Sequence, residues 1–174
     1  DYRPDGQRWN YFLNTNLSHN TINIDGKIQY SGGTAHLVEE QKNSSQPYAC
    51  LDMSSLYKNQ ATKVIRRFQL LNDATMEIQD EVSLNNSSSQ LYWQVLTKAT
   101  VTLSGSVAQL SMNGKSIYFK IKEPVNAVFS VKPALSNSDG EKQLSGITIL
   151  QCHVNPNTVD NRITIRVSSD RNNL

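Results

Sequence analysis

Residues 107–121 read VAQLSMNGKSIYFKI, two runs of alternating apolar and polar residues on either side of Asn113-Gly114. Asn-Gly readily adopts the positive φ angles that a two-residue type I′ turn requires. The stretch therefore predicts a β-hairpin. Residues 21–30, TINIDGKIQY, repeat the pattern around Asp25-Gly26 and predict a second hairpin.

The rest of the chain alternates in a similar way. Further strand candidates are residues 35–40, 48–53, 62–71, 76–82, 90–97, 100–103, 127–131, 147–154 and 162–167. Polar turns separate most of them, and residues 136–143 are predicted to form a loop. Many short strands without long helical crossovers predict an all-β fold, an antiparallel β-sandwich. We expect a single β-sandwich domain over residues 1–174, with a polar, frayed tail at about 168–174.

One segment allows a second interpretation. Within residues 54–71, the apolar side chains lie partly on one face of a possible helix, and short apolar runs are ambiguous by periodicity alone. The members of that face are Leu56, Ala61, Val64, Ile65 and Phe68. A strand is favoured, and a helix stays open.

The composition excludes several classes of protein. The net charge is +2 and no basic run is longer than Arg66-Arg67, so the chain lacks the footprint of a dedicated nucleic-acid-binding protein. No apolar stretch is long enough to span a bilayer. The two cysteines, Cys50 and Cys152, lie in apolar, strand-like surroundings. We expect buried free thiols, because unpaired cysteine behaves as a small hydrophobe, and a bridge between them stays open.

The sequence contains no nucleophile elbow, no phosphate-binding glycine loop and no His-Glu-x-x-His metal motif. Its histidines, His19, His36 and His153, are far apart along the chain. Taken from spacing alone, each is expected to be a hydrogen-bonded histidine without a catalytic role. Asp80 and Glu81 are predicted to occupy a strand edge or a turn, since paired carboxylates need a cleft to become catalytic.

Residues 8–29, RWNYFLNTNLSHNTINIDGKIQ, resemble the heparinase II/III-like polysaccharide lyases. The resemblance rests on an Arg, an aromatic strand, a small residue followed by His19-Asn20-Thr21, an apolar strand, Asp25-Gly26 and a nearby Gln29. Weaker similarity extends to residues 48–57, 64–68, 78–81 and 93–99, so that it covers roughly residues 1–170.

That resemblance implies a function. Members of the family join an N-terminal helical toroid to a C-terminal β-sandwich and cleave uronic-acid-containing polysaccharides by β-elimination. Most of their catalytic residues lie on the toroid, and no stretch of this chain matches them. The resemblance therefore implies a C-terminal β domain of a periplasmic or secreted lyase. We expect its partners to be an acidic polysaccharide and the toroid, and we expect the isolated chain to be inactive.

The resemblance also implies two site residues. His19 matches one zinc ligand of the family, and the other ligands would lie upstream of this chain, so zinc is expected in the full-length protein and not in the isolated fragment. Tyr2 lies in the interval where relatives carry an active-site tyrosine. Tyr11 is the competing match, although it is expected to lie on a strand and pack in the core.

Two functions of other classes stay open. One is a non-catalytic carbohydrate-binding module, and the other is a purely structural or interaction domain. Carbohydrate-binding modules commonly expose a flat row of aromatic side chains, whereas Trp9, Trp93 and the seven tyrosines are scattered along this chain.

Overall fold

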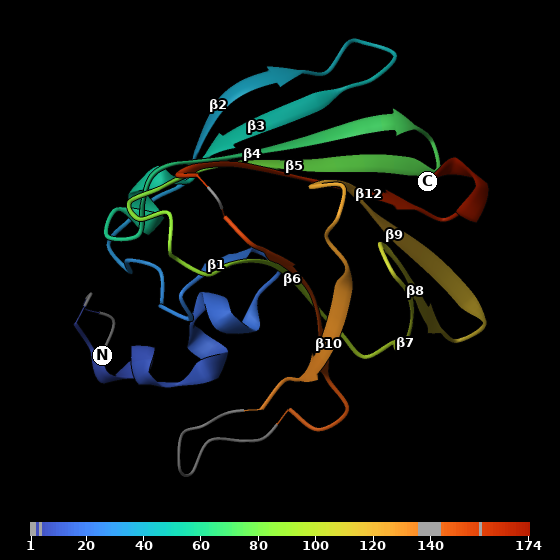
Figure 1. Cartoon of the computed structure of the whole chain (residues 1–174). Helices are drawn as coiled ribbons and strands as arrows, with labels where there is room; N and C mark the ends of the chain where they lie inside the picture. The colour runs from blue at the N-terminus through green and yellow to red at the C-terminus, as the bar shows by residue number, and fades with distance from the viewer. Residues whose placement is uncertain (1–2, 4, 136–143, 157) are drawn as a thin grey trace.

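The structure, a computed structural model, describes Arg3 and residues 5–135, 144–156 and 158–174. Within these residues, two antiparallel sheets face each other across one hydrophobic core (Figure 1). The predicted all-β, antiparallel sandwich is confirmed. The predicted loop at 136–143 lies outside the described residues.

The large sheet has eight strands, in the order β2 (His36–Gln41), β3 (Tyr48–Asp52), β4 (Ala61–Asn72), β5 (Thr75–Leu84), β12 (Asp160–Ser168), β9 (Lys115–Glu123), β8 (Val107–Met112) and β7 (Thr100–Ser104). The small sheet has four, in the order β1 (Ile22–Ile24), β6 (Leu91–Thr97), β11 (Thr148–Val154) and β10 (Phe129–Pro133). Each strand candidate from residue 35 onward is present within about two residues of its expected bounds.

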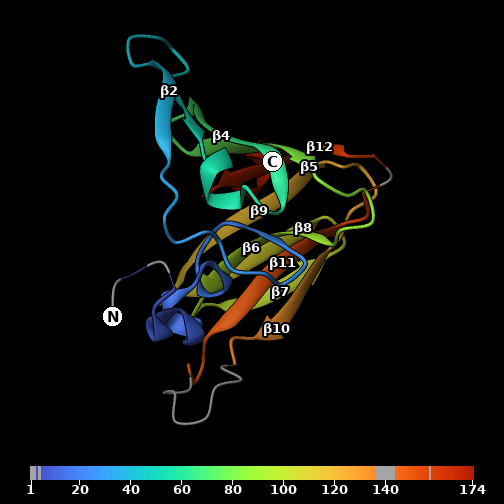
Figure 2. The same ribbon diagram turned by 90° about the vertical axis from the view of Figure 1, so that its left-hand side faces the viewer.

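Short 3-10 helices connect the strands. They are η1 (Gln7–Asn10), η2 (Phe12–Asn14), η3 (Asn16–Ser18), η4 (Ser54–Tyr57) and η5 (Arg171–Asn173). Figure 2 shows the first three together at one end of the small sheet. None of the described residues belongs to a helix long and apolar enough to cross a membrane.

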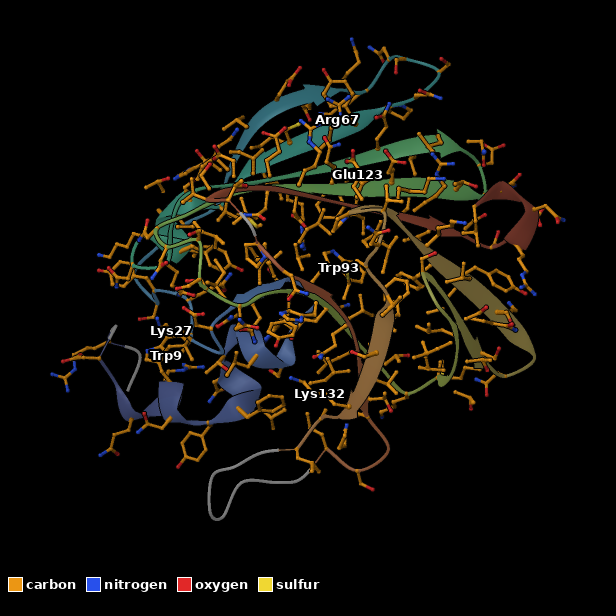
Figure 3. All side chains as sticks on the ribbon, viewed as in Figure 1. Trp9, Lys27, Arg67, Trp93, Glu123 and Lys132 are labelled. Carbon is orange, nitrogen blue, oxygen red and sulfur yellow. The ribbon has the colours of Figure 1, made fainter. Side chains whose placement is uncertain are left out.

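The core lies between the sheets because alternate residues of each strand point inward. Ile22, Trp93 and Cys152 lie side by side on three neighbouring strands of the small sheet, and each is almost fully buried. The ring centroid of Trp93 lies 6.1 Å from that of Phe119 on the large sheet. Figure 3 shows Trp93 in the space between the two sheets. Aromatic burial of this size contributes strongly to stability.

The hairpin predicted at Asn113-Gly114 is confirmed. These residues have φ angles of 53° and 74°, and Met112 pairs with Lys115 across the turn. Both central residues therefore have the positive φ that a type I′ turn needs.

The hairpin predicted at Asp25-Gly26 is wrong in its second arm. Both residues do have positive φ, so the turn forms. However, β1 pairs with β6, and residues 27–30 form no strand. The side chain of Asn16 instead bonds this arm, accepting from the Gln29 N–H at 2.7 Å and donating to the Lys27 carbonyl at 3.4 Å. The Asn16 side chain therefore supplies hydrogen bonds that a neighbouring strand would make in a hairpin.

The helical interpretation of residues 54–71 is also wrong. Residues from Ala61 to Asn72 form β4, and the helical part is limited to the single 3-10 turn of η4. Both cysteines are free and buried, as expected. At the chain end, where fraying was expected, Ser168 closes β12 and is buried, and Asp170 accepts a bond from the Asn172 N–H that begins η5.

Strand β2 has an unusual environment. It is the edge strand of the large sheet, and each of its six residues is exposed. Leu37 and Val38 keep 53% and 57% of their surface accessible. A register shift between Leu37 and Glu39 marks a β-bulge in its pairing with β3. The strand therefore contributes little to the core.

The Asn113-Gly114 turn leads to a prediction. Gly114→Ala should lower the free energy of unfolding by about 1–2 kcal/mol, because a side chain disfavours the left-handed region. Asn113→Asp is the matched control, since aspartate tolerates positive φ, and it should change the stability much less. Urea denaturation followed by Trp fluorescence measures both. Equal losses in the two variants would contradict the assigned turn.

Candidate functional site

His19 lies at the end of η3, on an exposed loop between that helix and β1. Its Nδ1 lies 2.6 Å from the carbonyl oxygen of Thr15. A carbonyl only accepts hydrogen bonds, so Nδ1 carries a proton in this arrangement. In the neutral imidazole, Nε2 then keeps its lone pair. The side chain is therefore accessible, and the Thr15 carbonyl orients its ring.

Gln94 of β6 holds the same loop from the small sheet. Its side chain is 1% exposed, and its amide nitrogen lies 3.2 Å from the Asn16 carbonyl, 3.0 Å from that of Leu17 and 3.0 Å from that of His19. Three carbonyls therefore share the two amide hydrogens. Buried amides of this kind are costly to leave unpaired, so Gln94 strongly favours the observed course of the loop.

Arg66 of β4 reaches the loop from the large sheet. Its guanidinium forms a bidentate ion pair with Asp80, with Nε–Oδ1 at 2.6 Å and Nη2–Oδ2 at 2.8 Å. The third nitrogen, Nη1, donates to the carbonyl of Asn20 at 3.1 Å. Both side chains are buried, Asp80 completely. The expectation that Asp80 occupies a strand edge or a turn is wrong, because its side chain points into the space between the sheets and neutralises Arg66.

Glu81, the neighbour of Asp80, points the opposite way. Its carboxylate lies 2.6 Å from Lys63 and 3.0 Å from Arg162 on the outer side of the large sheet. Strand alternation explains the difference between the two adjacent acids. Neither carboxylate has the environment of a catalytic acid or base, since each is held in an ion pair.

Tyr57 of η4 completes the support of the loop. Its hydroxyl donates to the Ile22 carbonyl at 2.9 Å and lies 3.1 Å from the Thr21 hydroxyl. Burial raises the pKa of Tyr57 to about 12, so the hydroxyl stays protonated at neutral pH and keeps this bond. The Asn20 side chain adds a bond from the Leu96 N–H at 2.9 Å.

These contacts have a common result. Backbone carbonyls of residues 15–22 accept bonds from buried side chains of β4, β6 and η4, which are distant in sequence. The loop is therefore pre-organised, and His19 projects from it with one ring nitrogen oriented and the other available. Such support is what a binding residue needs to keep its geometry.

A shallow open groove of about 200 Å³ lies beside this loop. It contains aromatic and amide side chains, and Lys58 Nζ lies 3.4 Å from the centre of the Tyr30 ring that lines it. Its lining residues are Trp9, Asn14, Thr15, Asn16, Ile28, Gln29, Tyr30, Ser31 and Leu56. The amides of Asn14 and Asn16 in this groove already bond backbone atoms.

The other candidate residues do not join His19. His36 is exposed on β2 and its Nε2 lies 2.8 Å from the Thr34 hydroxyl. His153 stacks on Tyr92, with ring centroids 4.6 Å apart. Within the described parts of the chain, no group of three or more His, Cys, Asp or Glu side chains could hold a metal ion. Tyr2 lies outside the described residues.

Tyr11 differs from its expected environment. It lies between η1 and η2 and not on a strand, and 46% of its surface is accessible. The segment of aromatic residues that precedes His19 contains the 3-10 helices η1 and η2 and not the strand that the resemblance implied. Sequence reasoning also missed the roles of Gln94 and Tyr57. A polar residue between apolar strand neighbours was the available signal for Gln94.

Comparison with known proteins supports the fold only. No family model matches the sequence, and no curated protein matches it. The fold is similar to a solved heparinase III gene product, with a TM-score of 0.71 and 15% identity over 96% of this chain and 26% of that chain. It is also similar to a heparan sulfate lyase from Pedobacter heparinus, with a TM-score of 0.69 and 9% identity over 90% and 25%.

A second heparinase III structure matches with a TM-score of 0.61 and 10% identity, over 85% of this chain and 22% of that chain. The chain thus spans about a quarter of the length of the proteins that it resembles. The predicted resemblance to heparinase-like lyases is confirmed at the level of the fold.

The buried ion pair generates a stability prediction. Asp80→Ala should lower the free energy of unfolding by about 3–5 kcal/mol, because it leaves the Arg66 charge buried and unpaired. Glu81→Ala is the matched control and should cost under about 1 kcal/mol, since its ion pairs are exposed to solvent. Urea denaturation gives both values. Amide hydrogen exchange of Leu96, whose N–H donates to the Asn20 side chain, should accelerate only in the first variant. Similar behaviour of the two variants would contradict the role assigned to Asp80.

Proposed function

We propose that this chain is the β-sandwich domain of a polysaccharide lyase, which cleaves uronic-acid-containing polysaccharides by β-elimination together with a helical toroid outside the chain. The observation that carries the proposal is the pre-organised, exposed His19 loop in a fold shared with a heparinase III and a heparan sulfate lyase. The substrate would be an acidic polysaccharide such as a glycosaminoglycan.

The chemistry explains why a second domain is needed. β-Elimination requires that the uronate carboxylate is neutralised, that a base removes the C5 proton and that an acid protonates the leaving oxygen. Beside His19 the described residues offer no second imidazole, since His36 lies on β2 and His153 lies on β11. The base and acid would therefore come largely from the toroid, with Tyr2 as the candidate that this chain contributes.

His19 would supply one ligand to a zinc ion. Its Nδ1–H bonded to the Thr15 carbonyl matches the orientation that metal-binding histidines usually have, and its Nε2 would face the metal. Zinc in proteins takes at least three protein ligands, so the remaining donors would lie outside this chain. Zinc bound in this way would join the loop to the neighbouring domain. An enzyme that degrades such polymers would act in the periplasm or outside the cell.

A non-catalytic carbohydrate-binding module is the second candidate. The groove that Trp9 and Tyr30 line supports it, because aromatic side chains commonly line ligand-binding sites. Trp93 is buried and contributes no binding surface. Binding of neutral oligosaccharides by the chain, without any requirement for uronate, would favour this candidate over the lyase domain.

The first test uses the chain alone. Eliminative cleavage produces an unsaturated uronate that absorbs ultraviolet light. We expect the purified 174-residue chain to release no such product from heparan sulfate, chondroitin or alginate. The reason is that no complete acid–base set can be assembled from its matched residues. Turnover by the chain above that of a mock purification would contradict the division of labour between the two domains.

The second test concerns His19 in the full-length protein. His19→Ala should weaken zinc binding at least 10–100-fold, the range seen when even residues behind a metal ligand are changed. The rate of elimination should fall with the zinc content. His36→Ala is the control, because His36 is also exposed but bonds only a local threonine. Metal analysis and circular dichroism accompany the assay. If His19→Ala keeps its zinc and its activity, the assignment of His19 fails.

A further inference from the structure

The outer face of the large sheet carries a basic cluster that the proposed function does not use. On β12, Arg166 lies between the buried residues Ile165 and Val167, so it points away from the core. On β9, Lys120 and Lys122 flank the buried Ile121 and point the same way. Lys120 is the register partner of Arg166. We call Lys120, Lys122 and Arg166 the β9–β12 cluster.

A β-bulge lies at Lys122, at the end of this cluster. Thr164 pairs with Glu123 whereas Ile165 pairs with Ile121, so Lys122 is the extra residue of β9. Bulges commonly redirect a side chain at functional positions. Here the bulge brings Glu123 to the outer face beside Thr164, while Lys122 lies close enough to Arg166 for their charges to interact.

The cluster contains more positive than negative charge. Glu77 pairs with Arg166 at 3.0 Å, and the Glu123 carboxylate accepts the Thr164 hydroxyl at 2.6 Å. Neither Lys120 nor Lys122 has a carboxylate partner among the residues that the structure describes. Like charges placed opposite each other in a sheet are destabilising. Partial burial, followed by the charges of Arg166 and Lys120, lowers the pKa of Lys122, and the attraction of Glu77 opposes this shift.

Three other basic residues on the same face each have an interaction partner. Lys63 and Arg162 share the carboxylate of Glu81. The Arg67 guanidinium lies 3.6 Å from the centre of the Tyr48 ring, and Figure 3 shows Arg67 on the side of the large sheet away from Trp93. The β9–β12 cluster therefore stands out as the place where an external anion would relieve repulsion.

We propose that the β9–β12 cluster binds an oxyanion group, a sulfate ester or a carboxylate, of an acidic polysaccharide. The site is separate from the His19 loop, which contacts the inward-facing Arg66 of the large sheet. Arg162 lies four residues from Arg166 on the same face of β12, about 13 Å along the strand. A linear polyanion can therefore contact both. That the anion belongs to a polysaccharide rests on the proposed function; the anion site itself does not.

The test compares two double variants in titrations with a heparin-derived hexasaccharide. Lys120→Gln/Lys122→Gln should weaken binding about 10-fold or more and flatten its salt dependence, since charge-assisted contacts and counterion release are both lost. Lys98→Gln/Lys115→Gln removes the same charge from two exposed positions, the turn after β6 and the start of β9, and should change the affinity less than about 3-fold. The urea midpoint of the first variant should not fall, because removing like-charge repulsion does not destabilise the sheet.

Further ligands separate the sources of the anion. Binding of a desulfated hexasaccharide at similar affinity assigns a carboxylate, and its loss assigns the sulfate ester. Competition by inorganic sulfate alone would show that the cluster binds any oxyanion, and would remove the polysaccharide from the proposal. Tighter binding of a DNA oligonucleotide, no binding of the hexasaccharide, or equal losses in the two double variants would each overturn it.

The results that would overturn the anion site differ from those that would overturn the proposed lyase function. His19→Ala should leave hexasaccharide affinity at the β9–β12 cluster unchanged, and the lysine variants should keep the zinc content of the full-length protein. A lysine-dependent affinity without any eliminative activity in the full-length protein would remove the lyase assignment and leave the anion site.

Discussion

The ion pair between Arg66 and Asp80, which face each other on adjacent strands of the large sheet, is the constraint on which the position of the His19 loop depends. Moving two charges out of water is costly, and the cost is offset only when geometry and hydrogen bonding are nearly complete. The bidentate contact uses two guanidinium nitrogens, and the Asn20 carbonyl uses the third. Any other path for residues 15–22 would leave a buried donor without an acceptor. The pair therefore favours one loop conformation over its alternatives.

The same principle applies to the other supports of the loop. Gln94 and Tyr57 are buried polar side chains, and each is satisfied by carbonyls of the loop. Because the interior has a low dielectric constant, each missing bond would be expensive. The loop has little regular secondary structure, yet it is held from both sheets. An exposed histidine on such a support can keep its orientation before any ligand arrives.

The sequence was informative about strands and less so about their partners. Period-two alternation reports that one side of a segment is buried, and that was sufficient to locate β4, β8 and β9. It cannot report which segment supplies the hydrogen bonds. Residues 27–30 alternate like a strand, but the Asn16 side chain bonds their backbone. Asp80 was misjudged for a related reason, since its partner Arg66 is fourteen residues away in sequence. His19 was singled out by its flanking residues, whereas the residues that hold it come from distant strands.

The exposure of β2 has a consequence for the behaviour of the chain in solution. An edge strand presents unpaired N–H and C=O groups, which act as a template for intermolecular β-sheet and for aggregation. The bulge between Leu37 and Glu39 interrupts that template, and Glu39 and Glu40 add negative charge to it. Two copies aligned antiparallel through β2 would bring these carboxylates together. The bulge and the two glutamates therefore counteract self-association of the strand through the apolar Leu37 and Val38.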